Sequence, residues 1–438
     1  MRRIRFSRTP AFDFEALRGL WAAAYDGGEF GEVAAVMARV RRGDFESWYR
    51  EWSAMADRVA ARGRAYDEPV SRGTALLRAA NYQRQAEFFL DPADPRRAAT
   101  AASGRDLFDA GLDALGTGIT RTRIPYDGAD LEALFMRPAE STRPAESMRP
   151  EGPDSRTVLV VQGGFDSTLE ELYFMLGAAA VRRGHCVLMF TGPGQGSSLR
   201  EHGMPFTAEW ERPTAAVLDW LDGLVEPRLL VGAGISFGGH LLARAAAFEP
   251  RYDGVVLYDY FPGMLTAFLH NVPRLVRGAF QRMPWWMRRA VPLYGRFDAQ
   301  ARWGIGNAFW TFGAESLPAL IDAMRPFDDR DWAGEITADA LVLLAEREHF
   351  YDPALGRDFA ARLTGARSVR VHTFAEADGG HLHCQNGALQ QAHEVIFDWV
   401  HALEHSVVTT EATRTPAGEG WDHGDRPGGT HRRSGNTH

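Results

Sequence analysis

The segment from Leu229 to His240, LLVGAGISFGGH, constrains the fold of this chain more than any other segment. An apolar run enters GISFG, which is centred on Ser236, and the Ala/Leu-rich segment HLLARAAAF follows directly with helical character. This order is the G-x-S-x-G pattern, in which a strand turns sharply into a helix and lifts a serine hydroxyl out of the backbone. Glycine suits both flanking positions, because a Cβ atom would collide in so tight a turn. The pattern therefore predicts a strand, a strained turn at Ser236 and a helix.

Around this segment, short apolar runs alternate with helical patterns. The predicted strands are TVLVVQGG, CVLMFTGPG, RLLVGAG, GVVLYDYF, ALVLLAE and SVRVHTF, and LQQAHEVIFDWVHALE predicts a closing amphipathic helix. Strands that are apolar throughout and alternate with helices form a parallel sheet covered on both faces. Before them, TRTRIPYDGADLEALFMRP predicts a hairpin that turns at Asp127-Gly128. We therefore expect an α/β fold with a mainly parallel sheet.

The sequence pattern also divides the chain into regions. Up to residue 117, apolar residues recur at helical spacing, which predicts a helical N-terminal domain. Residues 118–404 form the predicted catalytic domain, with an exposed loop at 138–156, rich in Pro, Glu, Arg and Ser, and a helical, lid-like insert at 262–332 after the sixth strand. The tail, 405–438, lacks periodicity, so we expect it to be disordered.

Composition excludes several classes of function. The net charge of -8 argues against nucleic acid or an anionic membrane as the main partner. All 49 basic residues are arginine, which excludes Schiff-base chemistry on a lysine. The two cysteines, Cys186 and Cys384, make no disulfide framework, and we see neither a secretory signal nor an apolar stretch long enough to span a bilayer. We expect a cytoplasmic enzyme without a cofactor and leave a homodimer open.

A reactive serine needs an oxyanion hole, and the sequence offers backbone donors at two places. The N–H of Phe237 would lie at the start of the helix that follows Ser236. The turn GGFD after the strand TVLVV, with Gly164 and Phe165, stands where a hydrolase of this architecture supplies its second N–H. By contrast, TGPGQG at 191–196 only superficially resembles a dinucleotide fingerprint, because it contains proline and no helix follows directly.

The base and the acid are expected after the last strands, in the chain order serine, acid, histidine. The segment DGGHLHCQ, just before the closing helix, offers His381 and His383, and sequence logic alone does not separate them. The loop after ALVLLAE offers Glu348, at the usual position for the acid, and Asp352 one short turn further. A metal site at His-Leu-His-Cys is disfavoured, because no further cysteine or carboxylate stands at ligand spacing.

Several motifs in this order resemble one family. GGFDSTLEELYF, GPGQGSS, GISFGGH, RWGIGNAFWTFGAES and HCQNGA, with GEFGEV, GDFESWYREW and NYQRQAEFF in the N-terminal part, are similar to the α/β-hydrolase family of 2,6-dihydroxypseudooxynicotine hydrolase, the FrsA-like proteins and the fungal polyketide chain-shortening hydrolases. The resemblance spans most of residues 25–402 and implies that the N-terminal helices form a cap. In the family the catalytic histidine directly precedes the Cys of the HC pair, which favours His383. The extra His381, and Glu where the family often has Asp, depart from the pattern.

The resemblance implies hydrolysis of a carbon–carbon bond between carbonyl groups, or of an acyl bond, in a bulky, often aromatic or polyketide-like small molecule. Either Ser236 or a water activated by His383 would attack the carbonyl. We expect substrate contacts from Tyr258 and Asp259, at the end of a strand, and from Trp310 in the insert. The alternatives are a carboxylesterase or peptidase with the same triad, a non-hydrolytic cyclase or acyltransferase, and a binding protein that has lost the chemistry.

Overall fold

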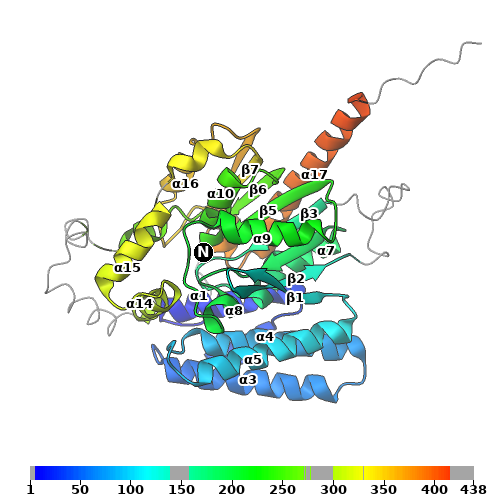
Figure 1. The fold of residues 1–438 in the computed structure, drawn as a ribbon. Coiled ribbons are helices and arrows are strands. Elements are labelled where there is room, and N and C mark those ends of the chain that lie inside the picture. The colour runs from blue at the N-terminus through cyan, green and yellow to red at the C-terminus, as the bar shows by residue number, and fades with distance from the viewer. Residues whose placement is uncertain are drawn as a thin grey trace, which may run out of the picture.

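A layer of N-terminal helices packs against a twisted sheet in the computed structural model of the chain (Figure 1). The structure describes residues 5–138, 157–270, 272, 277, 299–328 and 330–414. The N-terminal layer, which forms the cap, consists of α1 (Pro10–Trp21), the 3-10 turn η1 (Ala22–Tyr25), α2 (Phe30–Met37), α3 (Phe45–Ala65), α4 (Pro69–Phe88) and α5 (Arg96–Leu115). Local signals set two of the helix starts, because Asp44 and Glu68 accept hydrogen bonds from the first free N–H groups of α3 and α4.

The sheet has eight strands in the order β1-β2-β4-β3-β5-β6-β7-β8. Strands β1 and β2 form an antiparallel hairpin, β2 pairs antiparallel with β4, and all other pairs are parallel, so the predicted mainly parallel sheet is confirmed. The hairpin turns at Asp127 and Gly128, both with positive φ, as a two-residue type I′ turn requires. The strands are β1 (Thr120–Tyr126), β2 (Ala129–Met136), β3 (Thr157–Gln162), β4 (Cys186–Phe190), β5 (Leu229–Ile235), β6 (Gly254–Tyr258), β7 (Asp339–Ala345) and β8 (Val369–Phe374).

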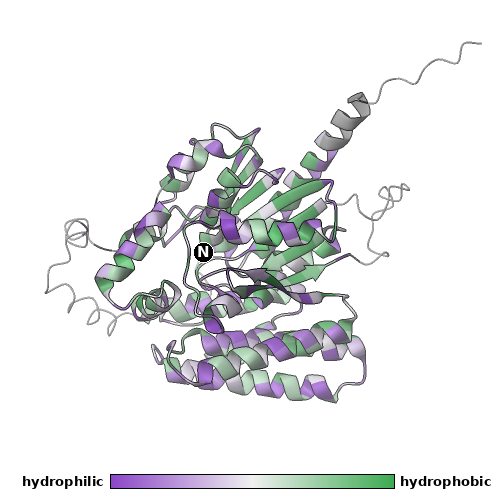
Figure 2. Cartoon of the chain, viewed as in Figure 1, coloured by the Kyte–Doolittle hydropathy of each residue, from purple (hydrophilic) through white to green (hydrophobic). Residues whose placement is uncertain are grey.

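Two apolar cores cover the two faces of the sheet. Successive residues of β3 belong to different cores, because side chains alternate across a strand: Val158 and Val160 pack in one, and Leu159 and Val161 in the other. Figure 2 shows the resulting hydrophobic colour along the central strands. The first core includes side chains of α9 (Glu211–Asp222), α10 (Phe237–Phe248) and α16 (Ala354–Ala360). The second includes α6 (Leu169–Leu172), the π-helical turn η4 (Tyr173–Gly177), α7 (Ala178–Arg182), α17 (Leu389–Arg414) and the cap.

The insert after the sixth strand, β6, is helical where the structure describes it. It contains α11 (Met264–His270), α14 (Ala299–Thr311), α15 (Leu317–Met324) and the 3-10 turn η5 (Arg325–Asp328), and the turn η6 (Asp331–Glu335) leads into β7. Helix α14 approaches the cap, since the indole N–H of Trp303 donates to the Phe88 carbonyl at 2.8 Å and the two rings stack with centroids 4.5 Å apart. The predicted loop at 138–156 lies, except for residue 138, outside the described residues.

The closing helix is longer than the sequence analysis expects. α17 continues to Arg414, so the prediction of disorder from residue 405 is wrong for residues 405–414. The physical reason is that no Gly or Pro interrupts the chain between Leu389 and Arg414, whereas Pro416 and Gly418 follow soon after. Residues 415–438 lie outside the described part. Among the described helices, none is both long and apolar enough to cross a membrane.

Candidate active site

Ser236 lies in the sharp turn between β5 and α10. Its φ of 60° and ψ of -125° are rare for a residue with a side chain, and its N–H donates to the Tyr258 carbonyl at 2.8 Å. A Cβ atom at Gly234 would overlap the carbonyl oxygen of Gly238, and one at Gly238 would overlap that of Gly163. Both flanking positions therefore require glycine, as the motif predicts.

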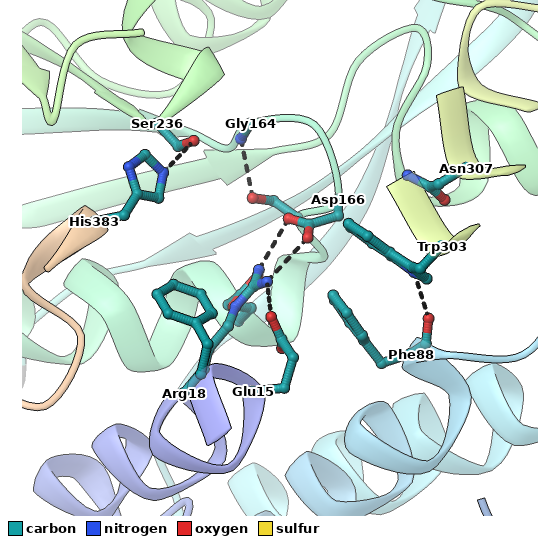
Figure 3. Close-up of polar contacts among 12 residues, drawn as sticks. Glu15, Arg18, Phe88, Gly164, Asp166, Ser236, Trp303, Asn307 and His383 are labelled. Atoms are coloured by element: carbon teal, nitrogen blue, oxygen red, sulfur yellow. Dashed lines mark hydrogen bonds and ion pairs between the residues drawn. The ribbon is translucent and has the colours of Figure 1, made fainter. Parts of the chain in front are cut away.

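The structure brings His383 and Glu348 to this serine. Nε2 of His383 lies 2.8 Å from Oγ of Ser236, as Figure 3 shows, and Nδ1 lies 2.5 Å from Oε2 of Glu348. The other Glu348 oxygen accepts from the N–H groups of His349 and Phe350, at 2.7 and 2.8 Å. Glu348 stands in the loop after β7 and His383 in the short turn η8 (His383–Gln385) before α17. This geometry orients the imidazole for proton exchange with the Ser236 hydroxyl.

A second carboxylate, that of Asp259, lies behind the same imidazole. Its Oδ2 is 3.3 Å from Nδ1 of His383 and accepts from the N–H of Cys384 at 2.5 Å. Its Oδ1 accepts from the N–H of Ala345 and the hydroxyl of Tyr351, at 3.1 and 3.3 Å. The sequence analysis expects Asp259 to contact substrate, but this fully buried side chain contacts the histidine and the backbone around it. The position of Asp259 directly after strand β6 was the sequence signal that could have indicated a role beside the catalytic histidine.

Burial and charge together shift the pKa values of these groups. Burial opposes ionisation of Glu348, but His383 and the hydrogen bonds to this carboxylate outweigh burial and lower its pKa. Burial also opposes a charged His383, yet its neighbours, Glu348 and Asp259 among them, raise the pKa of the imidazole well above its usual value. Burial raises the pKa of Asp259. These directions describe an imidazole whose charged form is stabilised by the carboxylates behind it.

The two competing residues from the sequence analysis lie elsewhere. Asp352 is exposed, and its carboxylate accepts from the N–H of Ala354 at 2.9 Å, at the start of α16. His381 accepts at its backbone carbonyl from the N–H of Arg347, at 2.9 Å, and among the described residues it is His383, not His381, whose ring hydrogen-bonds to Ser236. Of the two histidines and the two acids, the structure therefore brings His383 and Glu348 to the serine.

The turn with Gly164 and Phe165 lies against Ser236. A Cβ atom at Gly164 would approach Cβ of Ser236 to 3.2 Å and the nitrogen of Phe237 to 3.0 Å. The N–H of Gly164 donates to Oγ of Ser167 at 2.9 Å, while its carbonyl accepts from the Gln195 amide at 2.7 Å. Because the carbonyl and N–H of a trans peptide point in opposite directions, Gln195 orients the N–H of Phe165 to the other side of the turn.

Gln195 belongs to the TGPGQG segment, for which the sequence analysis proposes no role. Its amide also donates to the carbonyl of Gly163 at 2.7 Å, and its oxygen accepts from the N–H of Gly192 at 3.1 Å. It therefore links the loop after β4 to the turn after β3. The glycines around it were the sequence signal for this close approach of two loops.

The cap contacts the same turn through a buried ion-pair cluster. Arg18, on α1, donates to both oxygens of Asp166 at 2.9 and 3.0 Å (Figure 3). It also donates to Glu171 at 2.6 and 2.8 Å. Glu171 also pairs with Arg84 of α4 at 2.7 Å. Burial, as the largest effect, raises the pKa of the neighbouring Glu15 to about 7. No motif in the sequence identifies Arg18 or Asp166 as partners, because they are distant in the chain.

A hollow lies on the other side of this turn, between the cap, α14 and α8 (Gly196–Arg200). Its empty volume is about 460 Å³, part of it open to solvent, and its lining includes Phe165 and Trp310. Trp310, a predicted substrate contact, therefore borders this hollow, and the Arg97 guanidinium stacks over its ring at 4.2 Å. Tyr258, the other predicted contact, is completely buried, and its hydroxyl donates to the Cys384 carbonyl at 3.4 Å.

Asp259, His383 and Cys384 bring three atoms of metal-binding types within 4.8 Å of one another. Nδ1 of His383 already contacts Glu348, and Asp259 accepts hydrogen bonds on both oxygens. Burial raises the pKa of the Cys384 thiol to about 11, so the thiolate that a metal prefers is disfavoured at neutral pH. The contacts of these three residues fit a hydrogen-bonded base better than a metal site, and the absence of a metal stays a prediction.

Comparison with known proteins places these features in a family context. The model of the alpha/beta hydrolase family matches residues 158–396. The chain is 33% identical to the hydrolase acrC of Aspergillus aculeatus over 429 residues, which cover 90% of this chain and 97% of that protein. It is 31% identical to the 20-hydroxy-prefusarin hydrolase FUS2 of Gibberella moniliformis over 419 residues, which cover 89% and 95%.

Solved structures share the fold at lower sequence identity. The 2,6-dihydroxy-pseudo-oxynicotine hydrolase has a TM-score of 0.66 at 20% identity, with 86% of this chain and 94% of that chain covered. The protein AbyA5 has a TM-score of 0.61 at 20% identity, with 90% and 93% covered. Since both likenesses extend over most of this chain, they include the cap helices as well as the sheet.

Proposed function

Because the chain belongs to the alpha/beta hydrolase family, we propose that it is a serine-dependent hydrolase that cleaves a bond beside a carbonyl group in a bulky secondary metabolite. One observation carries this proposal: Oγ of Ser236 lies 2.8 Å from Nε2 of His383, whose Nδ1 lies 2.5 Å from Glu348. A carboxylate on Nδ1 keeps the proton on that nitrogen, so Nε2 is free to accept the serine proton. We assign Ser236, His383 and Glu348 the roles of nucleophile, base and orienting acid.

The reaction proceeds in two halves. In the first, Oγ of Ser236 bonds to the substrate carbonyl carbon while Nε2 of His383 takes the hydroxyl proton, and the N–H groups of Phe237 and Phe165 stabilise the oxyanion. When the carbonyl re-forms, the carbon–carbon bond breaks, its electron pair leaves as an enolate, and the imidazolium returns the proton to it. In the second, water attacks the acyl-serine, His383 again takes and returns a proton, and the carboxylic acid leaves. An ester would follow the same course with an alkoxide as leaving group.

Three features support a bulky substrate with carbonyl groups. The relative FUS2 is named for hydrolysis of 20-hydroxy-prefusarin, which favours a secondary metabolite as substrate for this chain too. The hollow beside Phe165 lies between the cap and the insert helix α14, and small-molecule sites occur preferentially at such interfaces between domains. Aromatic rings of both the cap and the insert, Phe88 and Trp303, stack at this position. We therefore propose a β-diketone or polyketide-like substrate, with an aryl or alkyl ester as the alternative.

The test compares two substrates and two proteins. The wild-type chain and Ser236→Ala are incubated with 1-phenyl-1,3-butanedione and with p-nitrophenyl acetate, and the products are identified by mass spectrometry. We expect the diketone to gain one water and split into a ketone and an acid, and Ser236→Ala to lose about a thousandfold or more of kcat. Cleavage of the ester alone would support the carboxylesterase alternative, and a product without added water would support a cyclase. Full activity of Ser236→Ala would contradict the proposal.

The remaining expectations concern a cofactor, the location of the protein and its oligomeric state. The steps above use only side chains and backbone groups of this chain, so we propose a reaction without a cofactor. A cytoplasmic location and a homodimer stay predictions, which fractionation and light scattering would test.

A further inference from the structure

One face of α14 is built as a wall of the hollow beside the reaction centre. Trp303, Asn307 and Trp310 are spaced at i, i+4 and i+7, so they lie along one face of this helix. All three line the hollow together with Phe165. In Figure 3, Asn307 and Trp303 lie beyond the Gly164 turn as seen from Ser236. The two indoles offer flat apolar surface, and the amide between them offers hydrogen bonds.

The Asn307 amide has an unused donor. The side chain is buried, and its Oδ1 accepts from the Arg97 guanidinium at 3.5 Å. This contact orients the amide so that Nδ2 points away from Arg97. Nδ2 is buried and has no hydrogen-bond partner within the described parts of the chain. A buried N–H group without a partner is rare, and it indicates an acceptor that arrives with a ligand.

The charges beside Asn307 favour an anion. Arg97 and Arg200 both pair with the same carboxylate, that of Glu87, and both guanidinium groups lie over the Trp310 ring, at 4.2 and 5.4 Å. The two guanidinium groups share the single carboxylate of Glu87, so these ion pairs leave one positive charge at this end of the hollow without a partner charge. A guanidinium group that stacks on an aromatic ring can still donate from the N–H groups at its edge. It can therefore bind a carboxylate or a similar anion.

Phe165 connects this end of the hollow to the bond-cleaving groups. Its ring borders the hollow and lies edge-on to Trp303, with centroids 6.1 Å apart. The same residue follows Gly164, where an added Cβ atom would lie 3.2 Å from Cβ of Ser236. A substrate whose carbonyl lies at Ser236 therefore reaches α14 by passing over Phe165.

We propose that Asn307, Arg97 and Trp310 form a binding site for a planar aromatic group that carries an anionic oxygen function, such as a carboxylate. The site would hold the far end of the substrate while the near end reacts at Ser236. This assignment as a substrate site rests on the proposed function, but anion binding itself does not require turnover.

Isothermal titration calorimetry on the full chain tests the site without any reaction. The probes are 2-naphthoate and 2-naphthamide, which share one ring system and differ in charge. We expect 2-naphthoate to bind wild type about tenfold more tightly than 2-naphthamide. Asn307→Asp keeps the shape but neutralises the positive charge, and Arg97→Gln removes it, so both variants should abolish this preference. Arg96→Gln is the matched control, because Arg96 lies next to Arg97 but pairs with Glu46 and Asp94 on the surface.

Each outcome has a defined meaning. Equal binding of the two probes to wild type, or an unchanged preference in Asn307→Asp, would overturn the proposal. If Arg97→Gln fails to fold, as circular dichroism would show, Asn307→Asp decides alone, because its new carboxylate can pair with Arg97. Loss of hydrolysis in Ser236→Ala with naphthoate binding retained supports both proposals. Naphthoate binding in a wild-type protein that hydrolyses nothing would contradict only the proposed reaction.

Discussion

The guanidinium of Arg18 and the carboxylate of Asp166 form two hydrogen bonds, 2.9 and 3.0 Å long, between the first helix of the cap and the turn after β3. Asp166 directly follows Phe165, whose N–H we propose as an oxyanion donor. The position of that donor therefore depends on Arg18, which stands 148 positions before Asp166 in the chain. An oxyanion donor acts on the transition state, so a displaced donor lowers kcat more than it raises KM.

Asp166→Asn tests this relationship. The amide keeps the size of the side chain but weakens both bonds to Arg18, and we expect kcat to fall by about tenfold or more with KM little changed. Arg18→Gln should lower kcat at least as much, because it also removes the contacts with Glu171. The double variant should be no worse than Arg18→Gln alone, because the contact with Asp166 is already lost in that single variant. Thermal unfolding of each variant controls for stability. Additive losses, or a change in KM alone, would contradict a positioning role.

Substitutions of the two acids in the loop after β7, Glu348 and Asp352, are expected to have different effects on kcat. Glu348→Gln removes the carboxylate on Nδ1 of His383 and should lower kcat by roughly a thousandfold or more. Asp352→Asn is the matched control, because Asp352 is exposed and its carboxylate accepts from the N–H of Ala354 at the start of α16. It should stay close to wild type. Steady-state kinetics with p-nitrophenyl acetate measures kcat for both variants. A larger loss of kcat in Asp352→Asn than in Glu348→Gln would exclude Glu348 as the orienting acid.

Substitutions of the two histidines, His383 and His381, should also have different effects on kcat. His383→Ala removes the group that contacts Ser236 and should match the loss in Ser236→Ala, about a thousandfold or more in kcat. His381→Ala should affect substrate affinity or stability more than kcat, because the contacts that the structure shows for His381 are a backbone bond to Arg347 and an electrostatic interaction with Glu376. Burst kinetics with p-nitrophenyl acetate measures the acylation step directly. A larger loss in His381→Ala would contradict the assignment.

Asp259 should tune the pH dependence of the reaction. The reaction needs neutral His383, so kcat/KM rises as pH passes through the pKa of this imidazole. Carboxylates raise that pKa, so Asp259→Asn should lower it and move the acid limb of the profile to lower pH. Asp352→Asn again serves as control. An acid limb that stays in place would show that Asp259 carries no charge relevant to the base.

Much of the fold could be predicted because its signals are local. The apolar strands, the Asp127-Gly128 turn and the glycines around Ser236 each act within a few residues, and the structure has all of them. The predicted helical N-terminal domain includes α1, but no separate helix was predicted for Pro10–Trp21. Its buried residues include Asp13 and Glu15, which interrupt the apolar spacing that identifies an amphipathic helix. Within the fold, Asp13 accepts from the N–H groups of Phe6 and Ser7, and Glu15 pairs with Arg18 at 3.4 Å. The apolar spacing of a single sequence does not reveal such polar contacts.

The same distinction between local and long-range signals holds for the candidate site. Ser236, Glu348 and His383 follow strand ends in an order that a known architecture predicts. Between Glu348 and Asp352, local sequence could not decide, because the choice depends on how the loop after β7 folds against η8. The Arg18–Asp166 contact and the second carboxylate at His383 arise only when the cap and strand β6 meet the catalytic loops.

Glu15 should make the stability of the protein depend on pH. Burial raises its pKa from 4.5 to about 7, and its Oε2 has no hydrogen-bond partner among the described residues. The folded state therefore binds a proton that the unfolded state has released between these two values, so the free energy of unfolding falls as pH rises through this window. The full loss from this group is on the order of 3 kcal/mol. Glu15→Gln mimics the protonated form and should raise the unfolding midpoint at pH 8 but not at pH 5, whereas the exposed control Glu315→Gln should change neither. Urea denaturation at both pH values measures this difference, and an equal effect of Glu15→Gln at the two values would contradict a raised pKa at Glu15.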